Sequence, residues 1–199
     1  MPVTRSLPIV ALGLAVLMLG GCSSSRERST DLSPPPARET LRDVPRWFNM
    51  PPHDEDFLFA SATATSRDLQ IAVNKAQVEG RAQLAQQMEV KYAGVTKRFG
   101  EEVGRSNESQ LLDQFTSVYK ATVSQVLYGT RPKEQIVRPE GEIYRVFVLM
   151  ELPTGEASRR LMEQVRANEQ LYTRFRSSEA FKELDAEVQR YEQWKRDQN

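Results

Sequence analysis

The spacing of hydrophobic and polar positions predicts a strand followed by a helix in the first half of the folded region. Phe57–Ser66 reads FLFASATATS, a run of aromatic, small and threonine residues that is typical of a strand. Thr65 and Asp68 then have the capping-box spacing that begins a helix. Gly80 costs about 1 kcal/mol relative to alanine inside a helix, so we expect it to make a close packing contact. The predicted inward stripe has helical spacing: Leu69, Ala72, Val73, Ala76, Gly80, Leu84 and Met88.

The next two segments carry mixed signals. Val90, Tyr92 and Gly94 alternate, whereas Val95, Phe99 and Val103 step by four, and we predict a second strand over Val90–Phe99 rather than a longer helix. The segment ESQLLDQFTSVYKATVSQVLYG is rich in β-branched residues, but about 20 residues is long for a strand. We therefore predict a helix that ends at Gly129.

A β-hairpin is predicted over residues 134–152. Pro139 and Gly141 occupy the positions that proline and glycine prefer in a type I turn. The second arm has one fully apolar face, formed by Tyr144, Val146, Val148, Met150 and Leu152. Its other face is only partly polar, as in a central strand, and Pro153 ends the arm.

From Thr154 the chain has helical spacing almost to its end. Apolar positions step by four and three up to Phe175 and again from Phe181, with Ser177 and Ser178 between them, which predicts two helices or one kinked helix. Two heptads on each side are too few for a coiled coil, so docking on the chain's own sheet and self-association both stay open. The pattern as a whole predicts an α+β fold: a βαβαββ domain over residues 47–153, with a small mixed or antiparallel sheet covered by helices, and a helical extension over residues 154–199.

Composition narrows the class of protein. The chain of 199 residues is 39% hydrophobic and 27% charged, and its mean hydropathy of -0.55 is too polar for a polytopic membrane protein. Lys+Arg and Asp+Glu both number 27, so no basic excess favours nucleic acid as a partner. The single cysteine excludes an internal disulfide and a site of several thiolates.

The N-terminus has the pattern of an exported protein. Arg5 precedes the apolar run Leu7–Leu19, which spans roughly 20 Å as a helix and is short of a ~30 Å hydrocarbon core. Leu19, Gly20, Gly21 and Cys22 together resemble the bacterial lipobox. The resemblance implies that residues 1–21 form a signal peptide, that the Cys22 thiol receives diacylglycerol and that its amine is acylated. The alternative is a free cysteine beside an uncleaved anchor.

Residues 22–46 are expected to form a flexible tether, because they are polar, contain several prolines and have only one large apolar side chain, Leu32, before Leu41. Ser23 stands where an aspartate would indicate retention at the inner membrane of enteric bacteria, which favours the outer membrane. Trp47 and Phe48 follow among prolines, and we expect an extended arm that docks on the domain, a ligand-binding aromatic pair being the alternative.

No residues combine into a predicted active site. His53 is the only histidine and lies in the acidic segment PPHDED, where a solvated loop is favoured over weak metal binding. Glu101 and Glu102 are adjacent, so they should diverge, and no G-x-S-x-G motif frames a serine. Arg159 and Arg160 indicate an exposed helix face. We therefore expect a non-enzyme without cofactor or metal.

Four segments carry a family resemblance: Pro45 with Trp47 and Phe48, SATATSRDLQIAVNKA (61–76), GTRPKEQIV (129–137) and IYRVFVLMELP (143–153). Over Pro45–Pro153 the chain resembles the small outer-membrane lipoproteins named for the twenty-kilodalton Helicobacter lipoprotein, the LPP-twenty-like family, which includes flagellar lipoproteins of the FlgP type. The resemblance implies no catalytic residues, and its FlgP-type members imply rings around a flagellar motor. The extension from Thr154 departs from the shorter members.

These observations predict a lipid-anchored outer-membrane lipoprotein that faces the periplasm. Its expected role is structural or interactive, through self-association or another envelope protein, and the FlgP-type members of the family imply association with a flagellum as one form of that role. The alternative is a lipid-anchored binding module for a small molecule or a glycan.

Overall fold

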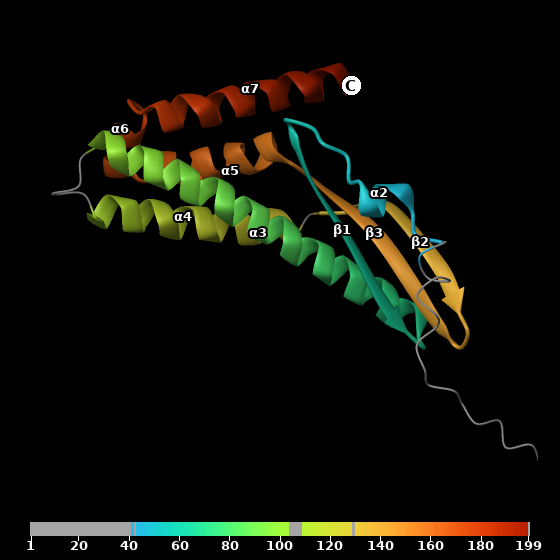
Figure 1. Ribbon diagram of the computed structural model, residues 1–199. Coiled ribbons are helices and arrows are strands. Elements are labelled where there is room, and N and C mark those ends of the chain that lie inside the picture. Colours follow the sequence, from blue (N-terminus) through green and yellow to red (C-terminus); the bar gives the residue numbers. More distant parts are fainter. Residues whose placement is uncertain (1–40, 42, 104–108, 129, 199) are drawn as a thin grey trace, which may run out of the picture. The chain divides into compact units, whose positions relative to one another are not determined.

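The computed structural model describes residues 41, 43–103, 109–128 and 130–198, which form an α+β fold as predicted (Figure 1). The elements follow one another in this order: α2 (Arg46–Asn49), β1 (Phe57–Ser66), α3 (Leu69–Val103), α4 (Ser109–Tyr128), β2 (Pro132–Glu140), β3 (Ile143–Pro153), α5 (Thr154–Arg166), α6 (Glu169–Phe175) and α7 (Glu179–Gln198).

The sheet has three antiparallel strands in the order β1-β3-β2, and the predicted first strand is confirmed. The central position of β3 explains its apolar character on both faces. Val146, Val148 and Met150 are fully buried on the face toward α3, while Phe147 and Leu149 are at most 2% exposed on the other face. The predicted central strand is therefore confirmed.

The hairpin is confirmed, but its turn lies two residues later than predicted. Glu140 pairs with Ile143, so Gly141 and Glu142 form a two-residue loop, and Gly141 has a positive φ of 58°. Two-residue hairpin loops require such a left-handed residue at the first loop position, whereas a type I turn does not. Pro139 pairs with Tyr144 inside β2, where an edge strand tolerates proline.

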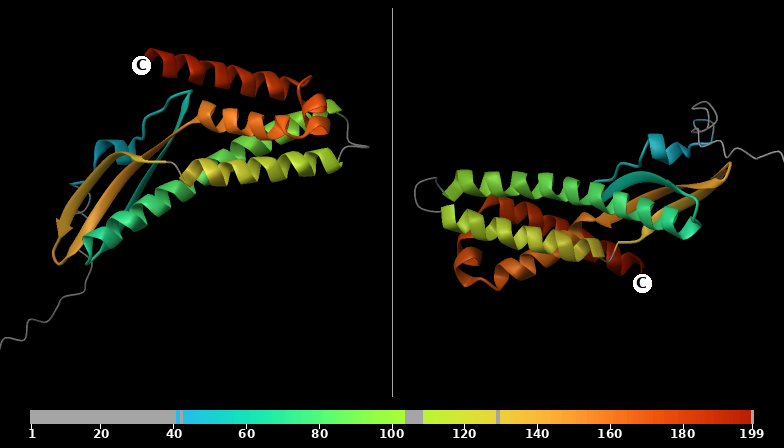
Figure 2. Two further views of the ribbon diagram at one scale, coloured as in Figure 1. Left: turned by 180° about the vertical axis from the view of Figure 1, so that it is seen from behind. Right: turned by 90° about the horizontal axis from the view of Figure 1, so that it is seen from below.

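The predicted strand over Val90–Phe99 is wrong, because α3 continues without a break through Val103. At 1.5 Å per residue this helix is about 52 Å long. Figure 2 shows its first half over the sheet and its second half beside α4 and α7. Tyr92, Val95 and Phe99 are 0% exposed and point into the helices, where the Phe99 ring lies 5.1 Å from that of Phe175. This burial at helical spacing outweighs the weak alternation that favoured a strand.

The start of α3 also differs from the prediction. Asp68, and not Thr65, caps the helix: its Oδ1 accepts a hydrogen bond from the Ile71 amide at 2.9 Å. Leu69 is 43% exposed, so it does not belong to the inward-facing stripe of α3 in which it was predicted to lie. The close contact expected at Gly80 is confirmed, because a Cβ there would lie 2.5 Å from Met150 Cγ.

Three helices, and not one or two, follow β3. A break at Ala167–Asn168 adds to the predicted one at the serines, and Asn168 caps α6 by accepting a hydrogen bond from the Leu171 amide at 3.0 Å. These helices pack mainly on one another and on α3 and α4, and they touch the sheet only near its end, where the Trp194 ring of α7 lies 5.5 Å from the Phe57 ring of β1. The junction of residues 153 and 154 coincides with the start of α5, and one hydrophobic core includes residues on both sides of it.

The segment with Trp47 and Phe48 docks on the sheet, although as a four-residue helix and not as an extended arm. The Phe48 ring meets the Phe147 ring edge-on at 5.2 Å. Phe147 lies on the face of β3 opposite to α3, so α2 and α3 cover opposite faces of the sheet (Figures 1 and 2).

Candidate functional site

The predicted lipidation site lies outside the described residues, together with its lipobox: Cys22, Leu19, Gly20 and Gly21. His53 is exposed in the loop before β1. Glu101 and Glu102 diverge as predicted, since Glu102 accepts a hydrogen bond from the Glu179 amide while Glu101 lies 4.0 Å from Lys97 Nζ. Within residues 41–198, as far as they are described, no three His, Cys, Asp or Glu side chains are placed to hold a metal ion. None of the described helices is long and apolar enough to cross a membrane.

A groove of about 710 Å³ runs along the free edge of β1. Ser61–Ala64 form its floor, Phe48 closes one side, and α3 forms the other wall with Ile71, Lys75 and Val78. Ile71 and Val78 are 48% and 64% exposed, so the wall presents apolar surface to solvent. The groove follows from the order of the described strands, in which one side of β1 has no neighbouring strand.

The backbone of β1 directs hydrogen-bonding groups into this groove that have no partner among the described residues. The Asp56 carbonyl accepts from Thr154 on the β3 side, whereas the Phe59 carbonyl accepts from Gln87 Nε2 on α3 at 2.9 Å. Amide and carbonyl groups alternate in direction along an antiparallel strand. Those of Ser61 and Thr63 therefore point away from β3, to the side on which an additional strand would pair.

The Thr63 hydroxyl adds an unmatched polar group to the groove. Its Oγ1 is buried and has no hydrogen-bond partner among the described residues. An unpaired buried hydroxyl costs roughly 1–3 kcal/mol. The other polar side chains of the lining are Ser61, whose hydroxyl donates to the Phe48 carbonyl, and Asn74, Lys75, Glu79 and Gln83. None of them pairs a hydroxyl nucleophile with a base. The arrangement suits binding rather than covalent catalysis.

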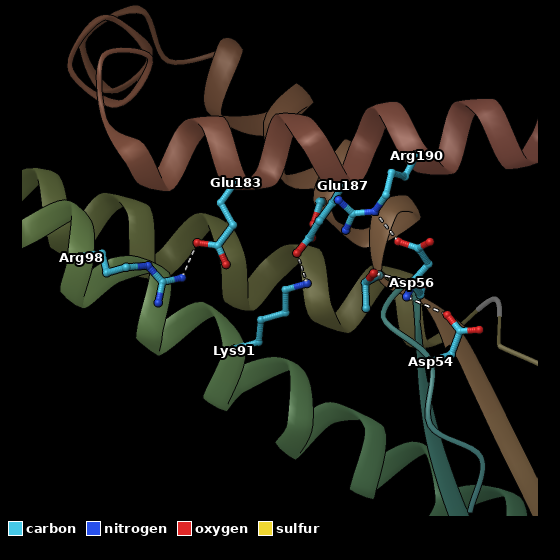
Figure 3. Close-up of polar contacts among 9 residues, drawn as sticks. Asp54, Asp56, Lys91, Arg98, Glu183, Glu187 and Arg190 are labelled. Carbon is cyan, nitrogen blue, oxygen red and sulfur yellow. Dashed lines mark hydrogen bonds and ion pairs between the residues drawn. The ribbon is translucent and has the colours of Figure 1, made fainter.

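A second feature is a polar seam that joins α7 to α3 and to the start of β1 (Figure 3). From one end to the other, Glu183 binds Arg98 at 2.6 Å, Glu187 binds Lys91 at 2.7 Å, and Arg190 binds Asp56 at 2.7 Å. The three α7 residues have helical spacing and therefore share one face. The seam fixes the position of α7 along α3.

Glu187 is the buried member of this seam. It is 9% exposed and accepts hydrogen bonds from Lys91 Nζ at 2.7 Å and from Ser158 Oγ at 2.6 Å. Nearby Tyr92 is fully buried, and its hydroxyl makes no hydrogen bond of normal geometry to any described residue. Burial raises the pKa of Tyr92 strongly; the Glu187 charge adds to this effect, and the neighbouring Ser158 hydroxyl opposes it.

The Arg159–Arg160 pair takes part in a second polar cluster, beside α7. Burial alone would raise the pKa of Glu156, but hydrogen bonds from Arg159 and Arg160 outweigh it and lower that pKa. Partial burial, with the charge of Glu156, raises the pKa of Tyr191 to about 12. The predicted exposed face is confirmed for Arg160, whereas Arg159 is half-buried among three glutamates.

Both raised tyrosine pKa values predict a loss of stability at alkaline pH. Each tyrosine binds its proton more tightly when folded, so its contribution is complete below the unfolded pKa of about 10 and declines as the pH rises above that value. For Tyr92 the slope reaches about 1.4 kcal/mol per pH unit. We expect Tyr92→Phe to remove this slope and to change stability at pH 7 by less than about 1 kcal/mol. Urea denaturation at pH 7, 10 and 11 measures both effects; equal slopes for the two proteins would contradict the prediction.

Sequence reasoning missed the groove, Lys91, Ser158 and Glu187. One signal was present for Glu187, because it continues the buried stripe of Ala180 and Leu184 at helical spacing. A carboxylate in such a stripe indicates a buried partner.

In comparisons with known proteins, no protein-family model and no curated protein matches the chain.

Proposed function

We propose that this chain is an outer-membrane lipoprotein, anchored by acyl chains on Cys22 and facing the periplasm, with a structural or interactive role and no catalytic activity. The observation that carries the proposal is the stretch Leu19–Cys22, in which the only cysteine follows an apolar run and two glycines. Two or more acyl chains are needed for stable anchoring, since one chain binds a membrane only marginally. The resemblance to the LPP-twenty-like family supports the same proposal.

The described groove supports an interactive role. It combines the exposed apolar side chains Ile71 and Val78 on α3 with backbone groups on β1 that have no partner among the described residues, which is the surface that an extended segment of protein requires. A module for a small molecule or glycan is the second candidate, because about 710 Å³ falls within the range of ligand pockets. That candidate predicts a melting temperature that rises with the concentration of a glycan or other small ligand.

The test is metabolic labelling with an alkyne analogue of palmitate in a bacterial host. We expect the unchanged chain to carry the label and to be cut before Cys22, and Cys22→Ala to carry none and to accumulate as the precursor. Ser23→Ala is the matched control and should be labelled normally. Normal maturation of Cys22→Ala would refute the proposal.

A further variant in the same experiment separates lipidation from location. In an enteric host Ser23→Asp should keep the label but move from the outer-membrane fraction to the inner-membrane fraction. Labelled Ser23→Asp that stays in the outer membrane would count against sorting by this residue and leave the lipid anchor supported.

A further inference from the structure

We propose that a second copy of this chain binds at the groove by adding its own β1 antiparallel to β1, which joins two three-stranded sheets into one sheet of six strands. The inference specifies the partner of the proposed interactive role. It rests on the proposed function, because the lipid anchor would confine the two copies to one membrane. Four observations support it: the direction of the backbone groups, the difference between the two sheet edges, the exposed stripe of α3, and the charge of the chain.

The backbone supplies the pairing. Ser61 and Thr63 direct their amide and carbonyl groups into the groove, and two antiparallel copies would pair these groups with each other. Pairing through backbone atoms needs no particular side-chain sequence, only an edge that is free of obstruction.

The two edges of the sheet differ in the way that matters for such pairing. The β2 edge carries Lys133, Glu134, Arg138 and Glu140, together with Pro139, which cannot donate a hydrogen bond. Charges and proline on an edge strand prevent association with another chain. Ser61–Thr65 on β1 contain neither a charge nor a proline. One edge is therefore protected and the other is open.

The wall formed by α3 is complementary to its own copy. Two antiparallel strands in one sheet are related by a twofold axis perpendicular to the sheet, so both copies of α3 would lie on the same face. Each copy brings the exposed apolar residues Ile71 and Val78, with one cation, Lys75, and one anion, Glu79, between and beside them. The apolar side chains of one copy would then contact those of the other. Each stripe carries one positive and one negative side chain, so the two stripes would not repel each other.

A second copy fits better than a charged partner. The chain has 27 basic and 27 acidic residues, so two copies do not repel each other at long range. Lipid anchoring at Cys22 would also confine the copies to one surface, which raises their effective concentration.

Disulfide cross-linking of the full chain in bacterial membranes tests the pairing. Cysteine is introduced singly as Ser61→Cys, Thr63→Cys or Thr65→Cys, and in the pairs Ser61→Cys with Thr63→Cys and Thr63→Cys with Thr65→Cys, and the membranes are treated with a mild oxidant. The single variants test registers in which a residue opposes its own copy, and the pairs test those in which neighbouring outward residues oppose each other. We expect at least one of these β1 variants to give a cross-linked dimer, because directly opposed residues have Cβ atoms about 4.5–5.5 Å apart. Arg138→Cys, exposed on the protected β2 edge, is the matched control and should stay monomeric.

Surface variants test the α3 stripe independently of the cysteines. Val78→Glu should lower the dimer yield of the best cross-linking variant by about tenfold, since it places a charge in the apolar contact. Val90→Glu is its control: Val90 is 75% exposed on the same helix and does not line the groove. Both sites are largely exposed, so neither variant should disturb the fold.

The outcomes separate cleanly. Monomers for every β1 variant, equal cross-linking through Arg138→Cys, or a product with a different protein would each overturn the pairing. The chain without an added cysteine reports on the anchor, because an acylated Cys22 has no thiol to oxidise. A dimer in that control would count against lipidation alone, whereas lipid-labelled β1 cysteine variants that all stay monomeric would count against the pairing alone.

Discussion

Gly155→Ala is expected to lower the free energy of unfolding by about 3 kcal/mol. Gly155 lies in the first turn of α5, against α7. A Cβ at this position would overlap Tyr191 Cβ and lie 2.6 Å from the carbonyl oxygen of Glu187. Neither obstacle can be relieved by a side-chain rotation, because both atoms are fixed by the backbone of α7. The two helices would have to separate, and the contacts around Glu187 would loosen with them.

Gly80→Ala provides the matched control. Its Cβ would also come close to an atom, Met150 Cγ at 2.5 Å, but the other neighbours are at 3.6 and 3.7 Å. Methionine is flexible enough to move aside, and alanine gains about 1 kcal/mol of helix propensity over glycine. We therefore expect a loss below about 1 kcal/mol. Urea denaturation followed by circular dichroism compares the two; equal losses would mean that backbone contact at Gly155 is not what matters.

Much of the fold could be predicted because single elements bury one face. The ten residues of β1 and the apolar faces of β3 have the period of a strand, and Leu111, Phe115 and Val126 of α4 have that of a helix. A local pattern of this kind predicts the observed element when no tertiary contact favours a different local structure.

The largest error arose where distant contacts decided the local structure. Val90–Phe99 is helical because Tyr92, Val95 and Phe99 find buried partners on elements that come later in the chain, among them Phe175. Such partners are not visible to an analysis of adjacent residues. The error in the turn is different, because Glu140 and Ile143 pair only three residues apart and Gly141 at the first loop position is a local signal for a two-residue loop.

The groove could not be predicted because it depends on topology. A run of small residues such as Ser61–Ala64 is the same sequence whether β1 is central or at an edge, and only the order β1-β3-β2 exposes it. The predicted lipid anchor, in contrast, depends only on a local motif formed by Cys22 and the residues before it. It therefore remains a prediction from the sequence, which the labelling experiment tests.

Glu187→Ala is the second large change, with an expected loss of about 2–4 kcal/mol in the free energy of unfolding. The substitution leaves Lys91, whose side chain is 20% exposed, without its ionic partner, and it leaves the buried Ser158 hydroxyl without its acceptor. Partial exposure of Lys91 lets its amine reach water, which keeps the loss below that of a fully buried pair.

Glu183→Ala separates burial from charge on the same helix. Glu183 binds Arg98 at 2.6 Å, but the two side chains are 46% and 47% exposed, and a pair of this kind contributes at most about 1 kcal/mol. The double variant Lys91→Met with Glu187→Leu removes both charges, so it should recover most of the stability that Glu187→Ala loses. Urea denaturation of the three variants at pH 7 gives the comparison. A loss for Glu183→Ala as large as that for Glu187→Ala would show that the seam acts through charge along its whole length. A double variant less stable than Glu187→Ala would show that the ion pair itself, and not the cost of leaving one charge alone, holds α7 on α3.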